Sequence, residues 1–209
     1  MKYNLNHLKK HLLKIQSPER FQHSVGVMYT CSALAMKYEE DLEKSMVAGL
    51  LHDCGKRLDC PVSKMIDLCD QFQLSVSESE YQSPILLHAK LGAYYAQHEF
   101  EVEDHDILHS ILAHNTTEKT MNQLDKIVYV ADYIEPGRRQ TSRMNLIRYT
   151  AFVNLDEAMM MILSDTLSYL KDKHFKIDPR TEYTYQHYWK LSKNQSDSVS
   201  TNLSLQEEK

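Results

Sequence analysis

Two adjacent residues, His52 and Asp53, bring different metal-binding groups to one point of the chain. They follow the apolar run of residues 47–51 and precede Gly55, so a buried helix that ends near Gly55 would carry both side chains inward. An imidazole and a carboxylate together suit a divalent first-row metal. Taken alone, the dipeptide is better explained as a His-Asp pair that satisfies itself at a helix end, so the choice depends on the rest of the chain.

Further polar residues interrupt apolar stretches that have helical spacing. They are His23, His88, His114 and Asp132. Burying the Asp132 carboxylate is costly unless it is paired or bound to a metal, whereas a single buried histidine is more often a hydrogen-bonded core residue. Because these residues lie on successive predicted helices, we expect them to converge with the His-Asp pair on one polar centre.

Helices are the elements expected to carry these residues. The chain has 209 residues but only 5 Gly and 5 Pro, the residues that tight turns consume, which argues against an all-β fold. Two helix starts are marked by a capping serine followed by proline, at Ser17-Pro18 and Ser83-Pro84. Apolar periodicity predicts helices at residues 18–38, 41–55, 61–74, 84–98, 104–114, 121–135, 144–152 and 155–174. The expected fold is therefore an all-α helical bundle.

The organisation expected of the chain is one domain with a short tail. Hydrophobic residues make up 42% and charged residues 25%, which suits a single packed core. Residues 1–191 are predicted to form this globular domain. Residues 192–209 are rich in Ser, Asn, Gln and Glu with almost no apolar anchor, so they are predicted to form a flexible polar tail.

Charge and hydropathy exclude some partners. A net charge of −5 and an isoelectric point near 6.1 argue against nucleic acid as a partner. No apolar stretch approaches the roughly 18–20 residues of a membrane span, and the first sixteen residues lack the apolar block of a signal peptide. Four cysteines without C-x-x-C spacing favour reduced, mostly buried thiols in a cytoplasmic protein. The oligomeric state stays open, with a homodimer as one option.

The order His23, His52-Asp53, Asp132 resembles the H…HD…D pattern of the HD-domain metal-dependent phosphohydrolases. Longer strings resemble one branch of that family, the symmetrical bis(5'-nucleosyl)-tetraphosphatases. These strings are RFQHS at residues 20–24, AGLLHDCGK at 48–56, LHA at 87–89, LDKI at 124–127 and ADYIEPGR at 131–138. The resemblance resumes weakly at residues 178–181. The HD pair alone is a weak signal, whereas ADYIEP-x-R combined with HD-x-x-K is specific.

The resemblance implies an HD-domain fold with a metal site. Its ligands would be His23, His52, Asp53 and Asp132. The resemblance implies iron, and the mixed nitrogen and oxygen set also suits Mn²⁺, Co²⁺ or Ni²⁺ better than it suits structural zinc. With Lys56, these four residues form the expected catalytic set, in which metal-activated water cleaves diadenosine tetraphosphate into two ADP.

Substrate binding is expected to depend on cations near the ligands, because a protein with net negative charge has to neutralise a tetraphosphate locally. Arg20, Lys56 and Arg138 each lie a short step along the chain from a ligand. His88 and His114 would donate hydrogen bonds to phosphate or bind a second metal, and the sequence leaves both roles open. The full set expected to bind substrate is Arg20, Asp53, Lys56, His88, His114, Asn115 and Arg138.

Two departures from the family pattern bear on nucleotide recognition. The family reads H-T-T-G where this chain has HNTT at residues 114–117, so the backbone freedom of a glycine is lost at Thr117. A family alanine-asparagine pair is replaced within residues 183–186, so nucleotide contacts from residues 178–191 stay open. Two alternative functions remain, a hydrolase of a deoxynucleotide or cyclic nucleotide and a nucleotide-sensing module that does not catalyse.

Overall fold

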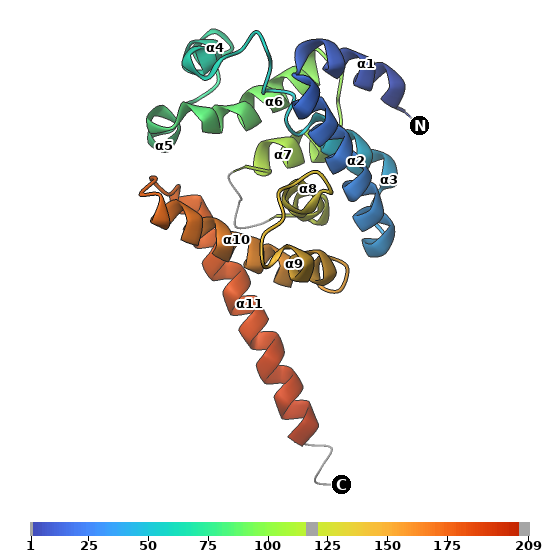
Figure 1. Ribbon diagram of the computed structural model, residues 1–209, viewed down its shortest axis with the longest axis vertical. Helices are drawn as coiled ribbons and strands as arrows, with labels where there is room; N and C mark the ends of the chain where they lie inside the picture. Colours follow the sequence, from blue (N-terminus) through green and yellow to red (C-terminus); the bar gives the residue numbers. More distant parts are fainter. Residues whose placement is uncertain (1, 116–120, 205–209) are drawn as a thin grey trace.

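The computed structural model describes residues 2–115 and 121–204, with side chains up to residue 191, and in these ranges it contains no β-strand. Two single 3₁₀ turns, η1 Val62–Lys64 and η2 Pro84–Leu86, accompany the α-helices (Figure 1). The α-helices are α1 Leu5–Ile15, α2 Pro18–Tyr38, α3 Leu42–Leu51, α4 Met65–Gln71, α5 Glu78–Gln82, α6 Leu87–His98, α7 His105–Ala113, α8 Gln123–Ile134, α9 Met144–Ala151, α10 Leu155–Asp172 and α11 Pro179–Ser204. The predicted all-α fold is confirmed.

The helix starts follow the local sequence closely, with two exceptions. The helix predicted over residues 61–74 begins with the 3₁₀ turn η1, and α4 starts only at Met65. Ser17 caps α2 by accepting a hydrogen bond from the Arg20 backbone, and Asp41 caps α3 in the same way. The predicted start at Pro84 is wrong by three residues, because Pro84 opens the 3₁₀ turn η2 and α6 begins only at Leu87. The Ser83 side chain makes no capping hydrogen bond there, so this segment lacks the N-cap that Ser17 provides for α2.

The main core lies where α2, α3 and α8 pack against one another, with α7 beside them and α9 and α10 on the far side of α8 (Figure 1). Leu34, Leu50 and Ile127 are fully buried there, and burial of each such side chain contributes about 1.5–3 kcal/mol. A smaller cluster around Met65 and Leu91 fixes α4 against α6. The same packing holds in place the helices that were predicted to carry the polar residues.

Gly55 sets the distance between the turn that follows α3 and helix α6. A Cβ atom at Gly55 would lie 2.1 Å from the His88 carbonyl oxygen and 2.8 Å from the Gly92 backbone nitrogen. Gly55 was predicted as a helix stop, but its φ is not positive, and the physical reason for glycine here is this close backbone approach. The approach brings the His52-Asp53 turn directly against His88.

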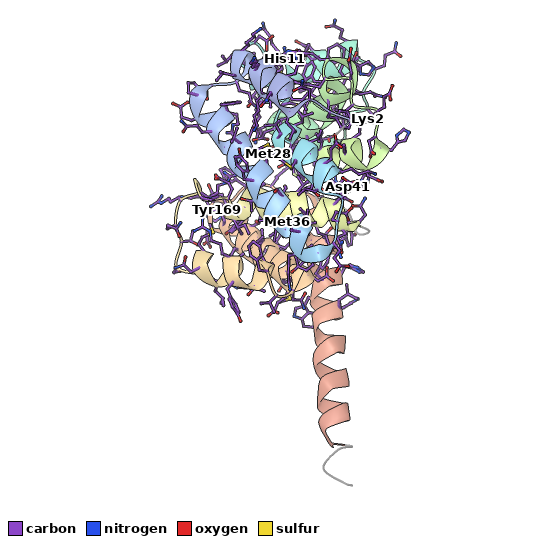
Figure 2. All side chains as sticks on the ribbon, turned by 90° about the vertical axis from the view of Figure 1, so that its right-hand side faces the viewer. Lys2, His11, Met28, Met36, Asp41 and Tyr169 are labelled. Atoms are coloured by element: carbon purple, nitrogen blue, oxygen red, sulfur yellow. The ribbon has the colours of Figure 1, made fainter. Side chains whose placement is uncertain are left out.

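Helices α1, α5 and α11 were not predicted. Helix α11 is anchored near its start, where Thr184 and Tyr188 are buried and contact with α10 is extensive, and it then projects away from the body in both views (Figures 1 and 2). The backbone stays helical to Ser204, whereas side chains from residue 192 and all of residues 205–209 lie outside the described part. The flexibility of the tail stays a prediction.

Removing residues 193–209 should leave folding and catalysis unchanged. The buried α11 side chains among those that the structure describes, which end at residue 191, precede the cut, so the shortened chain keeps those contacts with the domain. We expect a free energy of unfolding within about 0.5 kcal/mol of the full chain, measured by denaturant titration. A larger loss would mean that the last residues pack onto the domain.

Two further sequence expectations have a structural counterpart. No helix in the described ranges has both the length and the apolar character that a membrane crossing needs. Cys31, Cys54, Cys60 and Cys69 are all buried, which confirms that part of the prediction, and none of them forms a disulfide in the structure.

Candidate functional site

The four expected metal ligands meet at one point, although they come from three segments of the chain. His23 lies on α2, His52 and Asp53 on the turn after α3, and Asp132 on α8. His23 Nε2 is 3.0 Å from Asp132 Oδ1, and His52 Nε2 is 3.5 Å from Asp53 Oδ2 and 3.7 Å from Asp132 Oδ1. The helix packing therefore places donor atoms of His23, His52 and Asp132 within 4.8 Å of one another, as three ligands of a single ion would lie. Asp53 adds a carboxylate whose Oδ2 is 3.9 Å from His23 Nε2.

The His52 ring is oriented for coordination. Its Nδ1 donates a hydrogen bond to the Gly49 carbonyl at 2.8 Å, which leaves a lone pair on Nε2. Within the described residues, this buried Nε2 atom has no hydrogen-bond partner, nor has the buried Asp53 Oδ1. Burial also lowers the pKa of His52, so the imidazole stays neutral. A buried nitrogen without a partner is costly, and a bound cation would satisfy His52 Nε2. Asp53 Oδ1 lies 2.9 Å from the Lys56 ammonium group, so this oxygen already faces one positive charge.

His88 and His114 lie on the other side of the same carboxylate. Their Nδ1 atoms donate to the carbonyls of Ile85 and Ile111 at 2.6 and 2.7 Å, so both Nε2 atoms face inward. Those Nε2 atoms lie 3.1 Å apart, and 3.4 and 3.5 Å from Asp53 Oδ1. Burial lowers the pKa of His88 to about 3. Two inward lone pairs at this distance repel each other unless a cation lies between them.

Asp53 joins the two halves of this arrangement. Its Oδ2 faces His23 and His52, and its Oδ1 faces the other two imidazoles. Burial opposes ionisation, but nearby positive charge, including that of Lys56, holds the pKa of Asp53 well below its usual range. Asp53 is therefore ionised at neutral pH, as a carboxylate that binds a cation has to be. We call these groups the donor cluster: His23, His52, Asp53, His88, His114 and Asp132.

The three cations that the sequence singled out all contact carboxylates of the donor cluster. Arg20 Nη1 donates to Asp53 Oδ2 at 2.7 Å, and Lys56 Nζ donates to the same oxygen at 3.1 Å. Arg138 bonds both the carbonyl and the carboxylate of Asp132. All three head groups are partly exposed, so an incoming anion can reach them.

Asn115 lies beside the donor cluster and does not contact it. Its side chain donates to the Leu86 carbonyl at 3.4 Å and lines a cavity of about 540 Å³ between η2, α8 and α10. The departure from the family pattern at Thr117 lies outside the described residues. Asn115 was expected to bind substrate, and its position is open to a ligand that extends past His114.

Glu135 is a part of the site to which sequence reasoning gave no role. This buried carboxylate accepts a hydrogen bond from His23 Nδ1 at 3.0 Å and another from the Gly137 backbone at 2.6 Å. A Cβ atom at Gly26 would lie 2.5 Å from Glu135 Oε2, so the glycine leaves room for the carboxylate. The available signal was an acid inside an apolar helix end, within the string ADYIEPGR already matched to a family.

Comparisons with known proteins agree with this geometry. The pattern of the HD domain family matches residues 20–137. The symmetrical bis(5'-nucleosyl)-tetraphosphatase of Halalkalibacterium halodurans is 36% identical over 178 residues, which cover 85% of this chain and 91% of that protein. The protein of the same name from Bacillus subtilis is 34% identical over 173 residues, covering 83% of this chain and 90% of the relative.

A solved structure is also similar along nearly the whole chain. It is a crystal structure at 1.50 Å resolution of a predicted HD superfamily hydrolase involved in NAD metabolism from Clostridium acetobutylicum. The two folds agree with a TM-score of 0.85 at 32% sequence identity, over 90% of this chain and 98% of the other.

Proposed function

Because this chain belongs to the HD domain family, and within it to the symmetrical bis(5'-nucleosyl)-tetraphosphatases, we propose that it is a metal-dependent hydrolase that splits diadenosine tetraphosphate into two ADP. The observation that carries the proposal is the donor cluster, in which inward imidazole lone pairs and ionised carboxylates surround one point. The site draws all these groups from one chain, so the proposal needs no partner subunit.

His23, His52, Asp53 and Asp132 would hold one divalent ion, and we propose iron, with Mn²⁺, Co²⁺ or Ni²⁺ as substitutes. His88, His114 and Asp53 Oδ1 form a second triangle with sides of 3.1, 3.4 and 3.5 Å. Neighbouring ligands of one octahedral ion lie about 3 Å apart when each is ~2.1 Å from it. This favours metal binding over phosphate donation for the two histidines. When bound, such ions supply Lewis acidity and make water nucleophilic at neutral pH.

The chain's own cations would neutralise and orient the substrate. Arg20 and Lys56 approach from the Asp53 side, and Arg138 approaches from the Asp132 side. A tetraphosphate held between these two sides would present its middle phosphates to the donor cluster, which favours breakage of the central anhydride. Arg138 can grip phosphate with two N–H groups, whereas Lys56 acts as a point charge.

A nucleotide, not nucleic acid, is the proposed partner, since the net charge of −5 makes a polynucleotide a poor ligand for the surface as a whole. We propose a cytoplasmic location, in which the four buried thiols would stay reduced.

The products of diadenosine tetraphosphate test the proposed function. Attack of water on a β-phosphorus breaks the anhydride between the two β-phosphates, so anion-exchange chromatography should show ADP only. In oxygen-18 water, a single turnover should label the β-phosphate of one of the two ADP molecules. AMP with ATP, or label on an α-phosphate, would contradict the assignment. Cleavage of a deoxynucleotide or cyclic nucleotide alone would make one of those the substrate instead.

Glu135 should control metal affinity through His23, without touching the ion itself. Carboxylates that orient a ligand histidine typically contribute about 10–100-fold in metal affinity. We therefore expect Glu135→Ala to weaken metal binding by roughly tenfold or more, and Glu135→Gln, which still accepts from His23, to weaken it less. Titration of metal into the metal-free protein measures both effects.

A glycine variant separates this role from general damage to the site. The Cβ atom of Gly26→Ala would occupy the space of Glu135 Oε2, so this variant should lose metal affinity as Glu135→Ala does. Alanine suits the interior of α2 better than glycine, so the helix itself should not weaken. Normal metal binding by Gly26→Ala would show that the carboxylate does not orient His23.

A further inference from the structure

We propose that the two nucleosides of the symmetrical substrate occupy two unlike subsites, which meet at Ile85 beside the donor cluster. This inference rests on the proposed function and adds to it where each half of the substrate binds. One subsite is the cavity of about 540 Å³ that Asn115 lines, and the other is a shallower hollow of about 290 Å³ next to Arg20 and Lys56. Ile85 lines both.

The larger cavity has the character of a nucleoside site. Tyr169 and Phe175 line it, and both rings are more than half exposed, at 56% and 57%. An exposed ring face can stack on a base, while Thr166 brings a hydroxyl group to the lining of the cavity. Its volume falls within the ~300–1,000 Å³ of small-molecule sites. Ser79 and Asp178 hold α5 against the segment between α10 and α11, which forms one wall (Figure 1).

The walls of this cavity are bonded to the donor cluster. The Ile85 carbonyl accepts the hydrogen bond from His88 Nδ1, and Asn115 directly follows His114 and donates to the Leu86 carbonyl. A nucleoside in the cavity therefore lies beside the His88 and His114 side of the donor cluster, with its phosphates leading toward Asp53.

The smaller hollow combines charge with an apolar surface. Arg20 and Lys56, which both bond Asp53, stand next to the exposed aliphatic side chains of Leu58 and Val62. The cations would bind a phosphate, and the adjacent apolar surface would contact the nucleoside that is joined to it. No aromatic ring is among the described residues that line this hollow, so its hold on a base is expected to be weaker than that of the larger cavity.

Two substrates separate the subsites. Diadenosine tetraphosphate needs both, whereas adenosine 5'-tetraphosphate carries the same phosphate chain and only one nucleoside, which would take the larger cavity. Breakage of its central anhydride gives ADP and pyrophosphate, with water adding to one phosphorus and the other phosphate leaving. Phe175→Ala should raise KM about tenfold for both compounds, since stacking of one base is typically worth ~1–3 kcal/mol. The double variant Leu58→Ser with Val62→Ser should raise KM for diadenosine tetraphosphate alone, by about threefold or more.

Tyr149→Ala is the matched control, because this aromatic residue on α9 is even more exposed than the cavity rings and is not among the residues that line either subsite. Its KM values should equal those of the wild type. If the wild type makes ADP from diadenosine tetraphosphate but Phe175→Ala behaves like the control, or the serine variant raises both KM values equally, the two-subsite inference fails and the proposed function stands. A wild type that does not cleave diadenosine tetraphosphate overturns both.

Discussion

His52→Ala and Asp132→Ala should each abolish turnover and stop the protein from holding a metal ion. Both residues offer a donor atom at the meeting point of α2, α3 and α8, and His52 Nε2 has no other partner in the described structure. Loss of a Lewis acid typically removes several kcal/mol of transition-state stabilisation, so kcat/KM should fall by at least ~10³-fold. Elemental analysis of the purified variants, alongside product assays, measures both effects.

A control histidine distinguishes this result from a general effect of mutation. His7→Ala removes an exposed imidazole on α1, away from the donor cluster, and should retain metal and activity. The wild type should lose activity in a chelator and regain it when iron or manganese is returned. Full activity of the metal-free wild type would refute the proposed metal chemistry.

The sequence predicts the helical fold and the composition of the site well, for identifiable reasons. Capping residues such as Ser17 and Asp41 act within a few residues, so they are visible locally. Polar residues such as His52 and Asp132 interrupt apolar helical faces, and such interruptions are rare enough to mark a site. The sequence thus indicates that these groups converge, without saying how.

Distances across the fold are what the sequence leaves out. Gly55 reads as a helix stop, while its real constraint is the backbone of α6, more than thirty residues later in the chain. Glu135 and His23 meet only because α2 packs on α8, so their hydrogen bond has no local signature. The division of donor atoms around Asp53 into two sets likewise depends on where α6 begins and where α7 ends. Helix packing, not residue type, decides each of these points.

Lys56→Ala and Arg138→Ala should keep the metal and still lose at least ~10²-fold in kcat/KM. One charged contact made in the transition state is typically worth a few kcal/mol, and the tetraphosphate brings several negative charges to a protein that is itself negative. Without substrate, both side chains lie on carboxylates of the donor cluster, Lys56 on Asp53 and Arg138 on Asp132. A cation in that position competes with a metal, so the alanine variants should bind metal at least as tightly as the wild type.

This opposite direction of the two effects distinguishes substrate-binding cations from residues that only hold the site together. If Lys56 merely fixed Asp53, its removal would weaken metal binding and activity in parallel. Lys44 is the matched control, because it pairs with Asp104 and Asp106 on the surface, and Lys44→Ala should change neither property. Arg138→Lys should recover part of the rate, since lysine restores the charge but cannot form the bidentate hydrogen bonds that arginine makes with phosphate. Unchanged kinetics in Lys56→Ala and Arg138→Ala would show that neither side chain meets the substrate, and the charge neutralisation would then have to come from the ions at the donor cluster.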